Sequence, residues 1–153
     1  DDNFYLAGNN LIYKCKLIVD SFSTTTTIGS LGTADGQFME ISDIYFYDNG
    51  TGINEIVVAD SALDRISFLN LNGGFLRKIE PGTDIKGIAV KDGILYLPCA
   101  AGILEYSCEN GNKLKTWADY GEGNGKVIKS SLIDIMESKV YVENGTSIKV
   151  FEP

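Results

Sequence analysis

Residues 29–79 read GSLGTADGQFMEISDIYFYDNGTGINEIVVADSALDRISFLNLNGGFLRKI, and this stretch decides the fold. A glycine-rich lead-in is followed by four short runs rich in Ile, Val, Phe and Tyr, each closed by turn residues. These side chains fit the pleated, half-buried surface of a β-sheet. We therefore predict one antiparallel sheet with strands at Ile41–Tyr47, Glu55–Ala59, Arg65–Leu69 and Phe75–Ile79.

A second complete unit of the same kind is predicted at residues 85–117, with its first strand at Ile85–Lys91. Its turns Asp92-Gly93 and Asn110-Gly111 are strong hairpin signals, because tight turns need the positive φ that these residues tolerate. Repetition of one pattern at an interval of about 40 to 50 residues indicates stacked units that bury their faces against one another.

Two partial units flank the complete ones. The first, at residues 4–27, lacks a first strand, and its runs end with Ile18–Phe22. The segment Ser23 to Thr27 either extends an outer strand or forms a linker. The last unit, at residues 132–151, lacks an outermost strand. The prediction is a single all-β segment of repeated four-stranded antiparallel units, incomplete at both ends.

Equivalent positions of the units align directly. The third strands are aligned through Ile66-Ser67-Phe68, Leu104-Glu105-Tyr106 and the run from Ile148. We expect the tyrosines that recur in the second strands to pack between units. The second-strand matches are Tyr5-Leu6-Ala7, Val57-Val58-Ala59, Tyr96-Leu97-Pro98 and Tyr141-Val142-Glu143.

Composition excludes several function classes. The 153 residues are 44% hydrophobic, which suits one globular domain, and carry a formal charge of −8. That charge disfavours nucleic acid and anionic membrane surfaces. There is no histidine, so Ser-His and Cys-His nucleophile pairs and histidine-bound zinc are excluded. Cys15, Cys99 and Cys108 lack CxxC spacing and are expected to be buried free thiols.

The complete unit at 41–79 resembles the NHL repeat. The matching motifs are Asp35-Gly36-Gln37-Phe38, Val58-Ala59-Asp60, Arg65-Ile66 and Phe75 to Ile79, and Ile85 to Val90 matches the first strand of a following repeat. The chain departs from the pattern at Leu63-Asp64, and it has Asp43 and Asp134 where Gly87 fits the pattern. The resemblance implies a β-propeller, usually of six or seven blades.

About three and a half blades cannot close a ring. Unpaired strand edges at both ends would favour pairing with another chain. We therefore expect either a fragment of a longer propeller or a subunit that self-associates through its open edges. In the second case a half-blade at each end lets two chains make seven blades.

Acidic residues dominate the predicted loops on one face. We predict a binding rim for a basic protein or a cation at Asp35, Asp64, Asp119, Glu122 and Glu143. Asp43 and Asp134 begin innermost strands, where converging carboxylates could hold calcium, and solvated strand ends or contacts with backbone amides are the alternative. Asp60 and Arg65 are expected to pair across their hairpin and to cap it.

These observations favour a non-enzymatic binding or scaffold module that mediates protein–protein interaction or assembly. We expect an extracellular or periplasmic location, no resident cofactor, no nucleic acid and no membrane insertion. The alternative is a calcium-dependent propeller hydrolase of the lactonase type, or part of one, which Asp43 and Asp134 would serve together with ligands from a partner.

Overall fold

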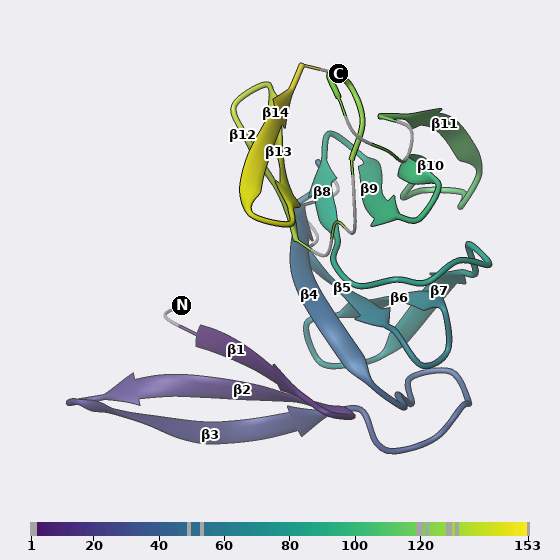
Figure 1. Cartoon of the computed structure of the whole chain (residues 1–153). Helices are drawn as coiled ribbons and strands as arrows, with labels where there is room; N and C mark the ends of the chain where they lie inside the picture. Colours follow the sequence, from purple (N-terminus) through teal and green to yellow (C-terminus); the bar gives the residue numbers. More distant parts are fainter. Residues whose placement is uncertain are drawn as a thin grey trace.

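The computed structural model describes residues 3–48, 50–52, 54–118, 121, 123–127, 130 and 132–152. Its strands form four separate antiparallel sheets in chain order (Figure 1). The first sheet contains β1 (Asn3–Gly8), β2 (Leu11–Ile18) and β3 (Ser21–Ile28). The second contains β4 (Ile41–Asp48), β5 (Asn54–Asp60), β6 (Arg65–Asn70) and β7 (Phe75–Ile79). The third contains β8 (Ala89–Lys91), β9 (Ile94–Cys99), β10 (Gly102–Ser107) and β11 (Lys113–Trp117). The fourth contains β12 (Ile133–Met136), β13 (Lys139–Asn144) and β14 (Ser147–Phe151).

The predicted all-β class and the arrangement of two complete sheets between two three-stranded sheets are confirmed. Each sheet is a meander in which sequential strands pair, because short turns join them. Asp92 and Gly93 both have positive φ, 50° and 77°, as a tight hairpin turn requires. No helix in the described part of the chain is long and apolar enough to cross a membrane.

Two strand predictions in the first and third sheets need correction. Ile18–Phe22 is not one strand, because the chain turns at Val19-Asp20 between β2 and β3. The threonine run extends the outer strand β3, so the linker alternative is wrong. The predicted strand Ile85–Lys91 is a strand only from Ala89. Before that point the backbone leaves the ladder, and the N–H of Ile88 binds the carboxylate of Asp43 instead.

Strand register also corrects the alignment of the third strands. Ala59 pairs with Ile66 in the second sheet, and Pro98, its equivalent, pairs with Ile103 in the third. The residue equivalent to Ile66 is therefore Ile103 rather than Leu104. The sequence alone placed this strand one residue out of step, because Ile103 and Leu104 are both apolar and only the pairing distinguishes them.

The core lies between neighbouring sheets. Ile12, Ile28 and Phe38 pack with Ile56 and Val58 between the first and second sheets. The second and third sheets share the largest buried cluster, which includes Val57, Phe68, Leu95 and Leu97. Tyr96 and Ile103 pack with Val140 and Val142 between the third and fourth sheets. Each central sheet thus buries both faces, which explains why β5 and β10 are apolar on consecutive residues.

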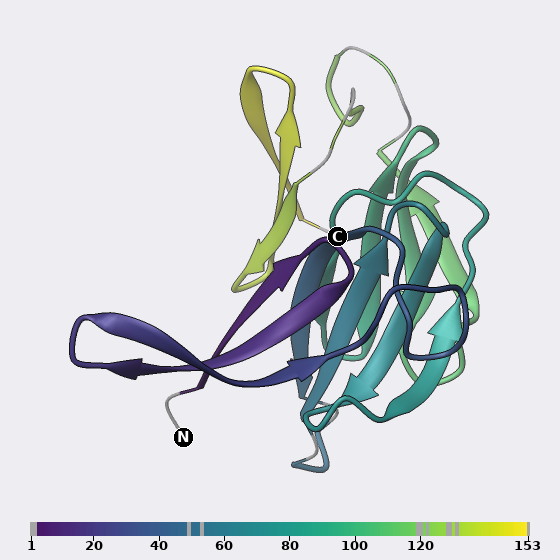
Figure 2. The same cartoon turned by 90° about the horizontal axis from the view of Figure 1, so that it is seen from below.

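The first strands of successive sheets lie side by side, with contacts between β4 and β8 and between β8 and β12. In the first sheet β1 takes this inner place against β4. The outer part of the first sheet extends away from the other three in both views (Figures 1 and 2). The sheets therefore form an open row, and the ends of the inner strands of the last three sheets border a shared hollow.

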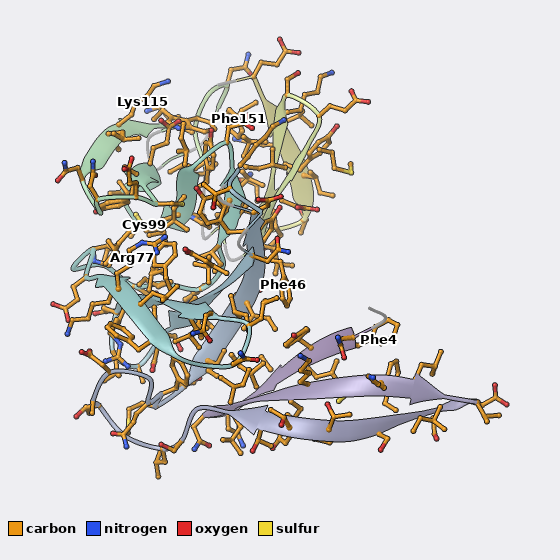
Figure 3. All side chains as sticks on the ribbon, turned by 180° about the vertical axis from the view of Figure 1, so that it is seen from behind. Phe4, Phe46, Arg77, Cys99, Lys115 and Phe151 are labelled. Atoms are coloured by element: carbon orange, nitrogen blue, oxygen red, sulfur yellow. The ribbon has the colours of Figure 1, made fainter. Side chains whose placement is uncertain are left out.

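Three cysteines are free and buried, as predicted. Cys99 and Cys108 belong to the cluster between the second and third sheets, where burial raises the pKa of the Cys108 thiol to about 12. Arg77 crosses the same junction from β7 and donates from Nε to the carbonyl of Cys108 (Figure 3). These thiols pack as small apolar side chains.

Candidate functional site

A hollow of about 500 Å³ opens where β4, β12 and β13 come together. Carboxylates on its wall come from three different strands, namely Asp43 on β4, Asp134 on β12 and Glu143 on β13. The rest of the wall is aromatic or aliphatic: Tyr45, Ile88, Leu132, Ile133, Tyr141 and Ile148. The hollow therefore combines an apolar surface with negative charge.

Asp43 is held in place by two backbone amides. Its Oδ1 accepts a hydrogen bond from the N–H of Ile44 at 2.8 Å, and its Oδ2 accepts one from the N–H of Ile88 at 2.9 Å. The second bond ties β4 to the segment that leads into β8 of the next sheet. Burial raises the pKa of Asp43 above its usual 3.8 against the opposing effect of both amides, and the charge of Asp134 raises it further.

Asp134 lies on β12 of the fourth sheet and is exposed. The sequence aligns it with Asp43, but register makes it equivalent to Tyr45, because Asp134 pairs with Tyr141 and Tyr45 pairs with Val57. Oδ1 of Asp134 accepts a hydrogen bond from the N–H of Ile135 at 2.8 Å, which repeats the bond between Asp43 and Ile44. Its Oδ2 has no hydrogen-bond partner among the described residues. The alternative given for both aspartates, solvated strand ends or contacts with backbone amides, describes this geometry: Asp43 accepts from two amides, and Asp134 is exposed and accepts from one.

Aromatic side chains supply much of the remaining wall. Tyr45 follows Asp43 by two residues, so both lie on the same face of β4. Burial raises the pKa of Tyr45, and the charges of Asp134 and Asp43 raise it further. Tyr141 lies directly opposite Asp134 across the β12–β13 ladder. Neutral rings beside carboxylates are the surroundings in which proteins hold alkylammonium and guanidinium groups.

The residues predicted for an acidic rim do not all lie together. Glu143 lies in the hollow with Asp43 and Asp134. Asp35 lies in the lead-in to β4 with its carboxylate 3.6 Å from the Lys78 ammonium, and Asp64 is exposed in the turn between β5 and β6. Asp119 and Glu122 lie outside the described residues.

Asp60 and Arg65 do not form the predicted ion pair. They are partners in the β5–β6 register, but Arg65 turns to the lead-in to β4, and Asp60 binds both that lead-in and the hairpin turn, which it caps at Ala62 and Leu63. The Asp60 carboxylate accepts hydrogen bonds from the N–H groups of Met39 and Glu40, and Arg65 donates to the carbonyls of Thr33, Ala34 and Gln37. Both groups therefore fix the lead-in, which has no strand ladder to satisfy its own backbone.

The tyrosine prediction holds for the first and third units and fails for the fourth. Tyr5 packs on Phe46 with ring centroids 4.8 Å apart, and Tyr96 is buried between the third and fourth sheets. Tyr141, at the same repeat position, borders the hollow. Sequence reasoning also missed Tyr45 and Ile88 as wall residues, although the spacing of Tyr45 from Asp43 on one strand was a usable signal.

The described residues include no group of three or more His, Cys, Asp or Glu side chains arranged to hold one metal ion. Asp43, Asp134 and Glu143 border one hollow without converging on a single point. A hard ion such as calcium takes 6 to 8 oxygens at about 2.3–2.6 Å, so calcium at this hollow would need further ligands, as the sequence-based prediction stated.

No protein-family model matches the chain, and no curated protein is similar to it in sequence. Solved structures share its fold. The computationally designed Ika4 protein matches with a TM-score of 0.63 at 15% identity, over 99% of this chain and 86% of that one. A "Putative exported protein" from Bacteroides fragilis matches with a TM-score of 0.66 at 14% identity, over 100% of this chain and 48% of that one. BamB from Moraxella catarrhalis matches with a TM-score of 0.56 at 10% identity, over 99% of this chain and 58% of that one.

These likenesses show the fold alone: the chain is an open row of antiparallel sheets of the β-propeller type. It spans about half the length of the two natural proteins that it matches. The more specific resemblance to NHL repeats stays a prediction.

Proposed function

We propose that the chain is a non-enzymatic binding module and that its hollow takes a positively charged side chain from a protein partner. One observation carries the proposal: Asp43, Asp134 and Glu143, from three strands, surround a wall of tyrosine and isoleucine. The aliphatic part of a lysine or arginine fits such a wall while its charged end meets the carboxylates. The overall charge of −8 would steer a basic partner to the surface.

Asp134 is the residue on which binding should depend most directly. It is exposed, and its Oδ2 has no partner among the described residues, whereas both oxygens of Asp43 already accept backbone hydrogen bonds. A ligand ammonium would therefore reach Asp134 without breaking an existing bond. Asp43 would attract the ammonium through its charge while keeping both of its backbone hydrogen bonds.

Replacing Asp134 with asparagine is expected to weaken binding of a short lysine-containing peptide by roughly three- to tenfold, the effect of about 1 kcal/mol from one exposed charge. Titration of amide chemical shifts measures the affinity, and the same peptide with its lysine acetylated is the ligand control. Asp20→Asn, a matched change at an exposed aspartate in the β2–β3 turn, should leave the affinity unchanged. Equal binding of the acetylated peptide, or no effect of Asp134→Asn, would contradict the proposal.

Binding should also depend on pH in a defined direction. The ionised form of Asp43 attracts the cation, and burial raises the pKa of this carboxyl above 3.8. Affinity is therefore complete well above the raised pKa and declines as the pH falls through it. The decline should begin at a higher pH than an exposed aspartate alone would give, and the Asp43→Asn variant should lose that early part of the decline.

A calcium-dependent hydrolase is the second candidate, because Asp43 and Asp134 border the same hollow and their charges interact. Calcium titration by calorimetry separates the two functions. Heat of binding that disappears in both Asp43→Asn and Asp134→Asn would favour calcium. Absence of heat alongside peptide binding would leave the binding module.

An extracellular or periplasmic location is part of the proposal. It is supported by the fold shared with the "Putative exported protein" of Bacteroides fragilis. Fractionation of the source cells with an antibody to this chain tests it, and recovery in the cytoplasmic fraction alone would contradict it.

A further inference from the structure

Each end of the row of sheets has one sheet face covered by its neighbour and one face without a partner sheet. On the first sheet the uncovered face, here called the N-face, carries Phe4, Leu6, Tyr13, Leu17 and Phe22. On the fourth sheet the uncovered face, here called the C-face, carries Leu132, Met136, Tyr141, Ile148 and Val150. Most of these side chains are large, apolar and exposed. Figure 3 shows Phe4 on the arm formed by the first sheet.

The N-face carries residues at positions that are fully buried elsewhere in the chain. Alignment of the second strands makes Phe4 and Leu6 equivalent to Ile56 and Val58 in the second sheet and to Leu95 and Leu97 in the third. Those four residues have 0% exposure, because each pair packs on the preceding sheet. Phe4 and Leu6 are 42% and 50% exposed, although they are as apolar as their equivalents. The N-face is therefore built as one side of a junction between sheets.

The C-face is built as the other side of the same junction. Register makes Ile148 equivalent to Ile12, Ile66 and Ile103, all isoleucine and all 0% exposed against the following sheet. Ile148 is 69% exposed. Val150 is likewise equivalent to Phe68, which is buried in the cluster with Leu97 between the second and third sheets.

We propose that a second copy of this chain covers both faces, with the N-face of each copy packed on the C-face of the other. One chain carries both halves of the junction, and the halves cannot meet within a chain because its two end sheets stand apart (Figure 1). The N-face side chains named above are all uncharged. The C-face also carries Asp134 and Glu143, which lie opposite Tyr141 and Ile148 in the ladder and border the hollow, so the second copy must leave both carboxylates open to the water of the hollow. A two-fold arrangement makes two identical junctions and closes without leaving a free face.

This arrangement differs from pairing through open strand edges. The end sheets have three strands each and pack by their faces, so two copies contribute eight sheets rather than the seven blades expected from the sequence. The second copy would also border the hollow, because Tyr141 and Ile148 belong both to its wall and to the C-face. The inference does not rest on the proposed peptide binding.

Light scattering during size exclusion, over a concentration series of the 153-residue chain, tests the proposal. The expected mass rises to twice 16.6 kDa and stops there. Leu6→Lys and Val150→Asp should each give a monomer at concentrations where the unchanged chain is a dimer. Leu76→Lys and Leu114→Asp are matched controls on outer strands, with 43% and 53% exposure, and should leave the dimer intact.

Mixing the two single variants gives the sharper result. In a mixed pair one junction joins Lys at position 6 to Asp at position 150, and the other junction has the unchanged residues. The mixture should therefore regain the dimer that neither variant forms alone, as one copy of each. A monomer at every concentration, an open series of larger oligomers, or a mixture that stays monomeric would overturn the proposal.

Discussion

Replacing Arg77 with methionine is expected to lower the free energy of unfolding by about 3 kcal/mol, because the change leaves a buried carboxylate without its cation. Two guanidinium nitrogens of Arg77 bind Glu55 at 3.1 and 2.7 Å. The Glu55 side chain is only 6% exposed, and that of Arg77 is 28% exposed. The figure lies at the low end of values for buried pairs, since water partly reaches the arginine.

Arg77 also joins two sheets, which adds to the expected loss. Its Nε donates to the carbonyl of Cys108 at 2.6 Å in the third sheet, and its guanidinium lies 4.1 Å from the centre of the Phe68 ring. Methionine keeps much of the apolar contact with Phe68 but supplies no donor to the carbonyl. The junction between the second and third sheets should therefore weaken along with the ion pair.

Urea unfolding monitored by the fluorescence of Trp117 measures the change. Lys78→Met, one residue further along β7, removes a cation with surface partners only and should leave the midpoint unchanged. Glu55→Gln combined with Arg77→Met removes both charges, so the double variant should be more stable than Arg77→Met alone. If Arg77→Met unfolds at the same urea concentration as Lys78→Met, the contacts that Arg77 makes with Glu55 and Cys108 do not contribute to stability.

Local pattern predicted most of the fold because each strand is bounded by its own turn chemistry. Phe75–Ile79, Lys113–Trp117 and Ser147–Phe151 are strands with the predicted bounds, each following a turn rich in Asn and Gly. The failures have a different origin. Strand β8 is short because Asp43, 45 residues earlier, takes the N–H of Ile88, and no local rule contains that contact.

Only those residues of the candidate site that the alignment of the repeated units singles out could be predicted from the sequence. Aligning Asp43 with Asp134 placed both near the starts of inner strands, and the structure places them in one hollow although their registers differ by two residues. Asp43 accepts a second amide hydrogen bond because the next sheet brings Ile88 beside it, whereas Asp134 lies in the fourth sheet and is exposed. The two uncovered faces could not be predicted from the sequence either. Leu6 and Val58 are both aliphatic residues in strands, and only the neighbouring sheet decides that Val58 is buried and Leu6 is exposed.

Replacing Asp60 with alanine is expected to cost about 4 kcal/mol, because four backbone N–H groups would lose their acceptor. Oδ2 of Asp60 accepts from Met39 at 2.8 Å, and Oδ1 accepts from Glu40, Ala62 and Leu63 at 3.2 Å each. Asp60 itself is 0% exposed, so water cannot replace the lost oxygens without opening the structure. One carboxylate thus holds both the β5–β6 turn and the lead-in to β4.

The Asp60→Asn variant distinguishes the contribution of Oδ1 from that of Oδ2. Asparagine fits the same space and keeps one carbonyl oxygen, which can serve Glu40, Ala62 and Leu63, but its NH₂ group faces the N–H of Met39. Asp60→Asn should therefore cost about 2 kcal/mol, roughly half the effect of alanine, as measured by the urea midpoint. Asp64→Asn is the matched control, since Asp64 is exposed with a φ of 46° that asparagine also adopts, and it should change stability by less than about 0.5 kcal/mol. Equal stability of the two asparagine variants would show that the lead-in is held without Asp60, and that the second sheet is fixed by its ladder and apolar faces alone.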